Sequence, residues 1–286
     1  MKDPWLRIQL IGGLGNQLFQ YATASAIAYK RDFRLLADNS FLPRMESPLT
    51  LLNLIEEDLS FINRVPKKFL GGELHRKYIN RLANNMVYER DLFVFDENLE
   101  SVKPNSTLRG FFQSWKYFKD RSLEIQNFIK APFVGNLNIS TAFPEIKGEA
   151  TIAIHVRHGD YKKLSETFGI LGRNYYKNSL GVALDLYPDA KILVFSDEVA
   201  SAREHVPNAH RYIGRESGLT DFETLILMSR ASVVIGANSS FSWWSAYLME
   251  QQNPLRVFPK TWFRSFDADF SDLIPTNWLK IDSDFV

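Results

Sequence analysis

Apolar runs and helix-spaced apolar residues divide the start of the chain into a strand, a loop, a helix and a second strand. Residues 7–11 (R-I-Q-L-I) form a short apolar run that leads directly into the glycine-rich sequence G-G-L-G-N-Q. Apolar and small residues then recur at helical spacing from Leu18 to Ala26, and F-R-L-L-A-D, ending at Asp38, has the composition of a strand. This order predicts a βαβ unit. Residues 41–110 are harder to read and predict mixed loops and short helices.

The same alternation returns more strongly after residue 150. Strand-like runs occupy residues 151–157, 191–197, 232–237 and 255–259, and helical patterns lie between them at 175–187, 221–231 and 241–251. Near-continuous apolar strands that alternate with helices predict a parallel sheet covered on both faces. Residues 131–150 are rich in Pro, Gly and Asn and predict a linker. We therefore expect two α/β domains, at residues 1–148 and 149–286.

Composition limits the classes of function. The 286 residues carry a formal net charge of +1, which argues against a nucleic-acid partner because such proteins present a basic surface. The chain contains no cysteine, so disulfides, thiolate metal sites and a cysteine nucleophile are excluded. We find no signal peptide and no apolar run near the roughly 18 residues of a membrane span. We expect a cytoplasmic protein with no transmembrane segment; peripheral membrane association and oligomeric state are left open.

Polar side chains follow three of the predicted strands at their carboxyl ends, where open parallel sheets bind ligands. Arg157 follows the first of these strands, Asp197 the second, and Asn238, Ser239 and Ser240 the third. The guanidinium of Arg157 offers a fork of donors that matches phosphate oxygens, although a structural salt bridge is the alternative. Serines at a helix start fit an anion site and also an ordinary N-cap.

Other polar positions leave two interpretations open. Asp197 could accept hydrogen bonds from a guanine edge or a ribose, or cap the helix that follows it. His155 shares a face of its strand with Arg157, but a buried histidine with satisfied hydrogen bonds is the commoner outcome. The first glycine loop fits a dinucleotide fingerprint poorly, since Leu18 replaces its third glycine and Asp38 lies beyond the usual spacing. The loop does predict a close approach of backbone to a phosphate or sugar, so we assign Gly13, Gly15 and Asn16 to donor binding.

Metal binding is not expected from the sequence. The D-x-D sequences Asp267-Ala268-Asp269 and Asp282-Ser283-Asp284 do not follow strands that carry other site chemistry, and we interpret both as solvated surface. Without a metal, fixed cations and N–H groups must stabilise a leaving diphosphate. We therefore expect no metal and no cofactor.

Four motifs resemble the signatures of the α-1,2-fucosyltransferase family, glycosyltransferase family 11. They are I-G-G-L-G-N-Q-L-F-Q-Y, G-F-F-Q-S-W-K-Y-F, H-V-R-H-G-D-Y and N-S-S-F-S-W-W-S-A, and they extend from residue 11 to residue 246. The resemblance implies an α/β fold of the GT-B type, with two facing Rossmann-like domains and an interdomain cleft. It also implies GDP-L-fucose as the donor, inversion at the transferred carbon and no metal requirement.

The resemblance also implies roles for individual residues. Arg157 contacts the donor diphosphate, and the other donor-binding positions of the second half are His155, Asp197, Asn238, Ser239, Ser240 and Phe241. Where the family usually has a second arginine this chain has His158, a change that could weaken donor binding or make it depend on pH. We assign Gln113, Ser114 and Trp115 to acceptor binding, although the aromatic cluster of Trp115, Tyr117 and Phe118 is more typical of a core.

These expectations combine into one reaction. Fucose is transferred from GDP-β-L-fucose to a sugar hydroxyl, the 2-OH of a galactoside, during surface-polysaccharide or oligosaccharide synthesis, and Arg157 stabilises the departing diphosphate. Asp160 is the candidate base, with a turn-forming aspartate as the equal alternative. Rival hypotheses are a transferase for another nucleotide sugar, a non-catalytic nucleotide-sugar-binding protein and a nicotinamide oxidoreductase. The last leaves the arginine, aspartate and serines of the second half unexplained.

Overall fold

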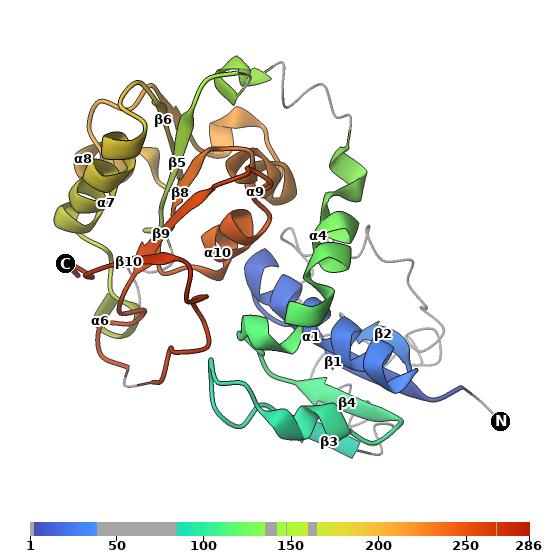
Figure 1. Cartoon of the computed structure of the whole chain (residues 1–286). Coiled ribbons are helices and arrows are strands. Elements are labelled where there is room, and N and C mark those ends of the chain that lie inside the picture. Colours follow the sequence, from blue (N-terminus) through green and yellow to red (C-terminus); the bar gives the residue numbers. More distant parts are fainter. Residues whose placement is uncertain (1–2, 39–84, 135–141, 147, 160–164, 267) are drawn as a thin grey trace, which may run out of the picture. The chain divides into compact units, whose positions relative to one another are not determined.

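The computed structural model describes residues 3–38, 85–134, 142–146, 148–159, 165–266 and 268–286 (Figure 1). The chain divides into two compact units, one of residues 1–125 with 271–273 and one of residues 126–270 with 274–286. The predicted linker at 131–150 therefore lies within the second unit. The domain boundary at residues 148 and 149 stays a prediction.

Within the described residues, the first unit is built on a four-stranded parallel sheet. Its strands are β1 (Trp5–Gln9), β2 (Arg34–Asp38), β3 (Asn85–Tyr88) and β4 (Ser106–Arg109), in the order β2-β1-β4-β3. Between β1 and β2 runs α1 (Leu14–Arg31), which Gly13 opens in an extended conformation and Asp32 ends in a left-handed one. Lys30 and Arg31 lie in its last turn, where positive charge is favourable. Sheet and helix reproduce the predicted βαβ opening.

Short helices complete the first unit and lead into the second. They are η3 (Glu97–Ser101), η4 (Trp115–Tyr117), η5 (Lys119–Arg121) and α4 (Ser122–Lys130), followed by η6 (Ala131–Phe133) and η7 (Pro144–Ile146). The division between the two units falls within α4.

In the second unit, the residues that the structure describes form a six-stranded parallel sheet in the order β10-β9-β8-β5-β6-β7. The strands are β5 (Thr151–Val156), β6 (Lys191–Ser196), β7 (Arg211–Ile213), β8 (Val233–Ile235), β9 (Leu255–Pro259) and β10 (Leu279–Ile281). The helices are α6 (Ser165–Phe168), α7 (Arg173–Leu186), α8 (Val199–His205), η9 (Arg215–Ser217), α9 (Asp221–Ser229) and α10 (Ser240–Tyr247).

Helices cover both faces of the second sheet. Figure 1 shows α7 and α8 on one side of it and α9 and α10 on the other. Every residue of β5 is buried, which explains why its sequence is apolar without alternation. Ile152, Ile154 and Val156 pack into the core beneath α7 and α8, whereas His155 contacts Phe241 of α10. His155 is thus the titratable residue of a strand whose other residues, apart from Thr151, are apolar.

The predicted fold class, α/β of the GT-B type, is confirmed in its two parallel, Rossmann-like units. The facing arrangement with an interdomain cleft stays a prediction. None of the helices in the described part of the chain combines the length and the hydrophobicity that crossing a membrane requires.

Candidate functional site

The ends of β5 and β6 bring Arg157 and Asp197 together. Val156 and Ser196 are aligned partners at the carboxyl ends of these parallel strands. The residues that follow them, Arg157 and Asp197, are therefore neighbours. The distance from Arg157 Nη1 to Asp197 Oδ2 is 3.0 Å, and the two side chains keep 31% and 13% of their surface exposed. The arginine and the carboxylate predicted at one edge of the sheet therefore form a partly buried ion pair.

Asp197 is enclosed by the loop that carries Arg157. Its Oδ1 accepts a hydrogen bond of 3.2 Å from the backbone N–H of His158, and the Gly159 N–H also contributes. Burial raises the pKa of Asp197, but Arg157 and these N–H groups outweigh burial and the net pKa is lowered. A Cβ atom on Gly159 would lie 2.2 Å from Asp197 Oδ2, so the loop can approach only without a side chain there. Asp197 thus orients Arg157, and its direct contact with a donor stays a prediction.

His155 lies beside this ion pair as a neutral, buried imidazole. Only 5% of the residue is exposed, and its ring lies 5.4 Å from that of Phe241 at the start of α10. Burial, followed by the nearby positive charge of Arg157, lowers the pKa of His155 to about 3. Within the described part of the chain, His155 Nδ1 has no hydrogen-bond partner. A buried polar atom without a partner costs about 1–3 kcal/mol, which makes it a candidate for contact with a ligand.

The start of α10 is a capped helix terminus, as the serine pattern predicted. Ser239 is the N-cap, and its Oγ accepts a hydrogen bond of 3.3 Å from the N–H of Phe241. Ser242 Oγ donates to the carbonyls of Ala237 and Ser239, which fixes the turn before the helix. Because β8 pairs with β5 and Phe241 contacts His155, this terminus belongs to the same cluster as Arg157. Ser240 is its first helical residue.

Asn238 has a structural use that the sequence did not reveal. Its Nδ2 donates to the carbonyls of Phe168 and Trp262, both at 3.0 Å. The side chain therefore ties the segments after α6 and after β9 to the start of α10. Its assignment to donor binding stays a prediction.

The glycine loop of the first unit is held to the second sequence motif by side-chain amides. Asn16 Oδ1 accepts a hydrogen bond of 2.7 Å from Gln113 Nε2, which joins a predicted donor residue to a predicted acceptor residue. Gln20 accepts from the Ile11 N–H and donates to the Gly110 carbonyl.

The glycines of this loop differ in what they do. Gly12 has a φ of +78°, and a Cβ there would lie 2.6 Å from Asn16 Nδ2, so Gly12 is the position that requires glycine. The predicted residue Gly13 has open space around its missing side chain, and Gly15 is buried within α1. The sequence pattern G-x-G predicted roles for Gly13 and Gly15 and gave no sign that Gly12 is the glycine that the backbone requires.

The three predicted acceptor residues lie in different environments. Gln113 is 8% exposed, Ser114 is fully buried and caps η4, and Trp115 is half-buried. Phe118 is fully buried against Phe19, with ring centroids 6.0 Å apart, so its assignment to the core is confirmed. Gln113 and Trp115 keep exposed surface, and their contact with an acceptor stays a prediction.

Glu89 shapes the second motif and was not found from the sequence. Its carboxylate accepts hydrogen bonds from the N–H groups of Phe111 (2.7 Å) and Phe112 (2.8 Å), where Phe112 has a φ of +53°. Burial raises the pKa of Glu89 despite these bonds. The residue falls in the part of the chain whose pattern was hardest to read, and no local signal marks it.

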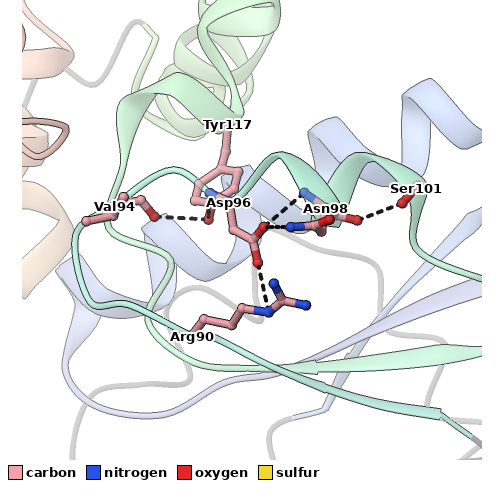
Figure 2. Close-up of polar contacts among 6 residues, drawn as sticks. All are labelled: Arg90, Val94, Asp96, Asn98, Ser101 and Tyr117. Carbon is pink, nitrogen blue, oxygen red and sulfur yellow. Dashed lines mark hydrogen bonds and ion pairs between the residues drawn. The ribbon is translucent and has the colours of Figure 1, made fainter.

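A cavity of about 520 Å³ lies in the first unit beside the edge strand β3. Figure 2 shows one wall of it, where Asp96 pairs with Arg90 and accepts two hydrogen bonds from Asn98. The hydroxyl of Tyr117 accepts from the Asp96 N–H and donates to the Val94 carbonyl, which holds this segment in place. The predicted site residues do not line this cavity.

The two D-x-D sequences have separate outcomes. Asp282 is exposed and lies 3.2 Å from Lys260, as expected for surface, whereas Asp284 accepts a hydrogen bond from the Asn174 N–H at the start of α7. Asp267, like the candidate base Asp160, lies outside the described residues. Among the residues that the structure describes, no group of three His, Asp or Glu side chains could hold a metal ion.

Comparison with known proteins identifies the family. The sequence model of glycosyl transferase family 11 matches residues 2–282, which is nearly the whole chain. This chain belongs to glycosyltransferase family 11. The family that the four motifs resembled is therefore confirmed, and the protein is a glycosyltransferase.

This family 11 glycosyltransferase is similar to proteins from bacteria and mammals. It is 26% identical over 290 residues to an alpha-1,2-colitosyltransferase of Escherichia coli, a match that covers 96% of this chain and 98% of that protein. It is 25% identical over 300 residues to the O-antigen biosynthesis glycosyltransferase WbnK of Escherichia coli, covering 95% and 99%. The galactoside 2-alpha-L-fucosyltransferase SEC1 of Bos taurus is 24% identical, covering 83% of this chain and 62% of that protein.

A solved structure also resembles this glycosyltransferase. The fucosyltransferase NodZ from Bradyrhizobium aligns with a TM-score of 0.48 and 16% identity, over 87% of this chain and 93% of that one.

Proposed function

We propose that this glycosyltransferase moves L-fucose from GDP-β-L-fucose to the 2-OH of a galactoside, with inversion to an α-1,2 linkage. Two kinds of observation support the proposal. The similar curated proteins include an alpha-1,2-colitosyltransferase and a galactoside 2-alpha-L-fucosyltransferase. The second unit holds the Arg157–Asp197 ion pair at the carboxyl ends of its central strands, where this fold class binds nucleotides. That ion pair is the observation that carries the proposal.

Arg157 is suited to bind a diphosphate. A guanidinium keeps its charge at all relevant pH values and can donate two parallel hydrogen bonds to phosphate oxygens. Asp197 holds it from one side at 3.0 Å, so the side chain is oriented before a donor arrives. An oriented cation gains interaction energy as negative charge develops on a leaving group, because it does not have to reorganise.

The start of α10 supplies the second set of donors. The first N–H groups of a helix lack intrahelical partners, and the helix dipole places partial positive charge there. Ser239 uses its Oγ to satisfy the Phe241 N–H, and Ser240 and Phe241 remain partly exposed at this terminus. We assign the diphosphate to the space between Arg157 and this helix start, with Ser239 and Ser240 as its hydroxyl contacts.

His155 contributes a neutral hydrogen-bonding group to the donor. Its lowered pKa, about 3, keeps the imidazole uncharged near neutral pH, so the positive charge that faces the donor is that of Arg157. His155 Nδ1 is buried and has no hydrogen-bond partner in the described part of the chain, and we propose that it hydrogen-bonds the nucleotide sugar once donor binding uncovers it.

The proposed reaction is a single displacement at C1 of the fucosyl group. The bond from C1 to the GDP oxygen breaks and its electron pair moves to the β-phosphate, while the acceptor oxygen forms a new bond on the opposite face. The fucosyl ring becomes oxocarbenium-like between these events. Arg157 and the α10 N–H groups lower the barrier because they bind the charged leaving group more strongly than the ground state. We propose Asp160 as the group that takes the acceptor proton.

The first unit is the proposed acceptor side. Gln113 is fixed by its hydrogen bond to Asn16, and the half-buried Trp115 presents an indole on which a sugar face could stack. We assign Gly13, Gly15 and Asn16 to donor binding, through close approach of the loop backbone to a phosphate or sugar. The similarity to an O-antigen biosynthesis glycosyltransferase supports a role in surface-polysaccharide synthesis, and we propose that this takes place in the cytoplasm.

The direct test is a transfer assay with purified protein, a panel of nucleotide sugars that includes GDP-fucose and an activated colitose, and a panel of galactosides. We expect GDP-fucose to be consumed and NMR of the product to show an α-1,2 linkage. We also expect full activity in excess EDTA, because the leaving diphosphate is stabilised by fixed protein groups. Transfer from the colitose donor alone would contradict the fucosyl assignment, and loss of activity in EDTA would contradict metal independence. Donor binding without transfer to any acceptor would indicate a non-catalytic binding protein.

A further inference from the structure

His158 lies at the position where the family usually has a second arginine, and its ring is turned into the protein. The residue is 1% exposed, so its side chain has almost no surface with which to contact a bound donor. Its Nδ1 lies 2.6 Å from Ser201 Oγ, on α8. The imidazole also meets the ring of His205 edge-on, with centroids 4.5 Å apart. We call His158, Ser201 and His205 the α8 anchor.

The α8 anchor is itself fixed. His205 Nδ1 lies 3.0 Å from the backbone carbonyl of Ser201, and because a carbonyl only accepts, this ring nitrogen carries the proton. The ring of Tyr176, on α7, meets His205 from another side at 6.2 Å. The backbone of Arg157 hydrogen-bonds the hydroxyl of Tyr176. Tyr176 therefore holds the backbone of Arg157, and Ser201 and His205 hold the side chain of His158.

The α8 anchor connects to the ion pair through backbone. The N–H of His158 donates to Asp197 Oδ1, while the other oxygen of the same carboxylate holds Arg157. A shift of the His158 ring would move its N–H group, and with it the carboxylate that orients the guanidinium. Of the titratable groups nearby, His205 contacts the His158 ring, and Asp197 contacts the His158 backbone N–H.

We propose that His158 is a positioning residue for Arg157, acting through Ser201 and Asp197, and that the α8 anchor fixes the loop that carries Arg157. The inference rests on the proposed function of Arg157 in binding the donor diphosphate. It departs from the expectation that the missing arginine leaves a gap in the charge facing the donor. Instead, the His158 imidazole hydrogen-bonds Ser201 and contacts the ring of His205, and these two contacts immobilise the loop that carries Arg157.

Ser201→Ala is the variant of choice because it removes one hydroxyl and leaves the loop, both histidines and all charges unchanged. GDP is the probe, titrated by calorimetry, and kcat for transfer is measured in parallel. We expect Ser201→Ala to weaken GDP binding by about threefold to tenfold, the size of one lost hydrogen bond. Ser201→Thr retains the hydroxyl and restores binding. Ser229→Ala is the control, since it removes a buried hydroxyl that donates to a carbonyl in α9 and lies outside the α8 anchor; it leaves GDP affinity unchanged.

A double-mutant cycle separates this inference from the proposed function. If the anchor acts through Arg157, Ser201→Ala changes GDP affinity less than about twofold in the Arg157→Lys background. An equal loss in both backgrounds, or no loss in the wild-type background, would overturn the anchor. If Arg157→Lys itself binds GDP as tightly as the wild type, the proposed role of Arg157 fails instead.

Discussion

The absence of a side chain at position 159 is what lets the loop close around Asp197. The Gly159 N–H hydrogen-bonds the Asp197 carboxylate, and a Cβ would lie 2.2 Å from its Oδ2, well inside any real contact distance. The backbone of Gly159 and the guanidinium of Arg157 thus share one carboxylate group. A methyl group at position 159 would displace that carboxylate rather than fill space.

Gly159→Ala should therefore lower both stability and donor binding. We expect a loss of about 1–3 kcal/mol in the free energy of unfolding, as for overpacking, together with weaker binding of GDP. Gly181→Ala is the matched control, because Gly181 lies in α7 and an added Cβ meets nothing within 4 Å. The control should gain about 0.5–1 kcal/mol, since alanine favours a helix over glycine. Urea denaturation and GDP titration measure these effects in both variants. Unchanged stability and GDP affinity in Gly159→Ala would show that the loop tolerates a side chain at this position.

The buried imidazole of His155 predicts an acid-sensitive stability. Its pKa falls from 6.5 in an unfolded chain to about 3 in the fold, so below pH 6.5 the unfolded state binds the proton and the folded state does not. The stabilisation is complete above pH 6.5 and declines as the pH falls towards 3. At pH 5 the loss amounts to about 2 kcal/mol, at roughly 1.4 kcal/mol per pH unit.

Urea denaturation at pH 8.5, 7.5 and 5.0 measures this contribution. The wild type should have similar stability at the two higher values and lower stability at pH 5.0. His155→Gln cannot titrate and should show a smaller decrease by about 2 kcal/mol, whatever its stability at pH 7.5. Equal losses of unfolding free energy at pH 5.0 in the two proteins would mean that His155 takes up a proton in the folded state as readily as in the unfolded state.

Helices α9 and α10 of the second unit both begin with a side-chain cap. Thr220 caps α9 through a complete capping box with Glu223, and Ser239 caps α10 through a bond to the Phe241 N–H. Both caps satisfy an N–H group that would otherwise lack a partner. Of these two helix starts, we assign an anion site only to that of α10, because α10 begins beside His155 and the Arg157 loop.

Removing each cap should separate stability from binding. Thr220→Ala and Ser239→Ala should each lose about 1 kcal/mol of unfolding free energy. GDP affinity should fall only for Ser239→Ala, because only its hydroxyl and helix start face the proposed diphosphate. Equal GDP affinities in the two variants would place the nucleotide away from α10.

At the scale of the whole molecule, a short C-terminal segment belongs to the first unit although the residues around it belong to the second. Asp272 in this segment is 7% exposed, accepts a hydrogen bond of 2.9 Å from the Phe95 N–H and forms an ion pair with Lys116. The first unit is therefore completed by residues that lie nearly at the end of the chain. Its folding should depend on them.

Asp272→Ala tests this dependence. The variant leaves the Phe95 N–H without its partner, and we expect a loss of about 1–3 kcal/mol of unfolding free energy, concentrated in the first unit. Asp272→Asn retains an oxygen acceptor for that N–H and should lose less. Hydrogen exchange should show faster opening of β3 and β4 in Asp272→Ala with β5 and β6 unchanged. Uniform acceleration across both sheets would contradict a local role.

The sequence predicted the second unit better than the first, for physical reasons. A strand buried on both faces, such as β5, is mostly apolar, and the polar residues Arg157 after β5 and Asp197 after β6 stand out where the strands end. Edge strands such as β3 and β10 are short and partly exposed, so they carry little pattern. Glu89 and Asp272 hold distant backbone groups, and Asn238 holds three carbonyls from two other segments. Such long-range hydrogen bonds leave no mark in the local sequence.

A crystal structure of the protein with GDP bound tests the proposed role of Arg157 most directly. We expect the β-phosphate to lie within hydrogen-bonding distance of the Arg157 guanidinium and to face the first N–H groups of α10. We also expect Asp197 to keep its contact with Arg157 in the complex. A diphosphate bound elsewhere, with Arg157 still paired with Asp197 and in contact with no phosphate oxygen, would show that Arg157 does not bind the leaving group.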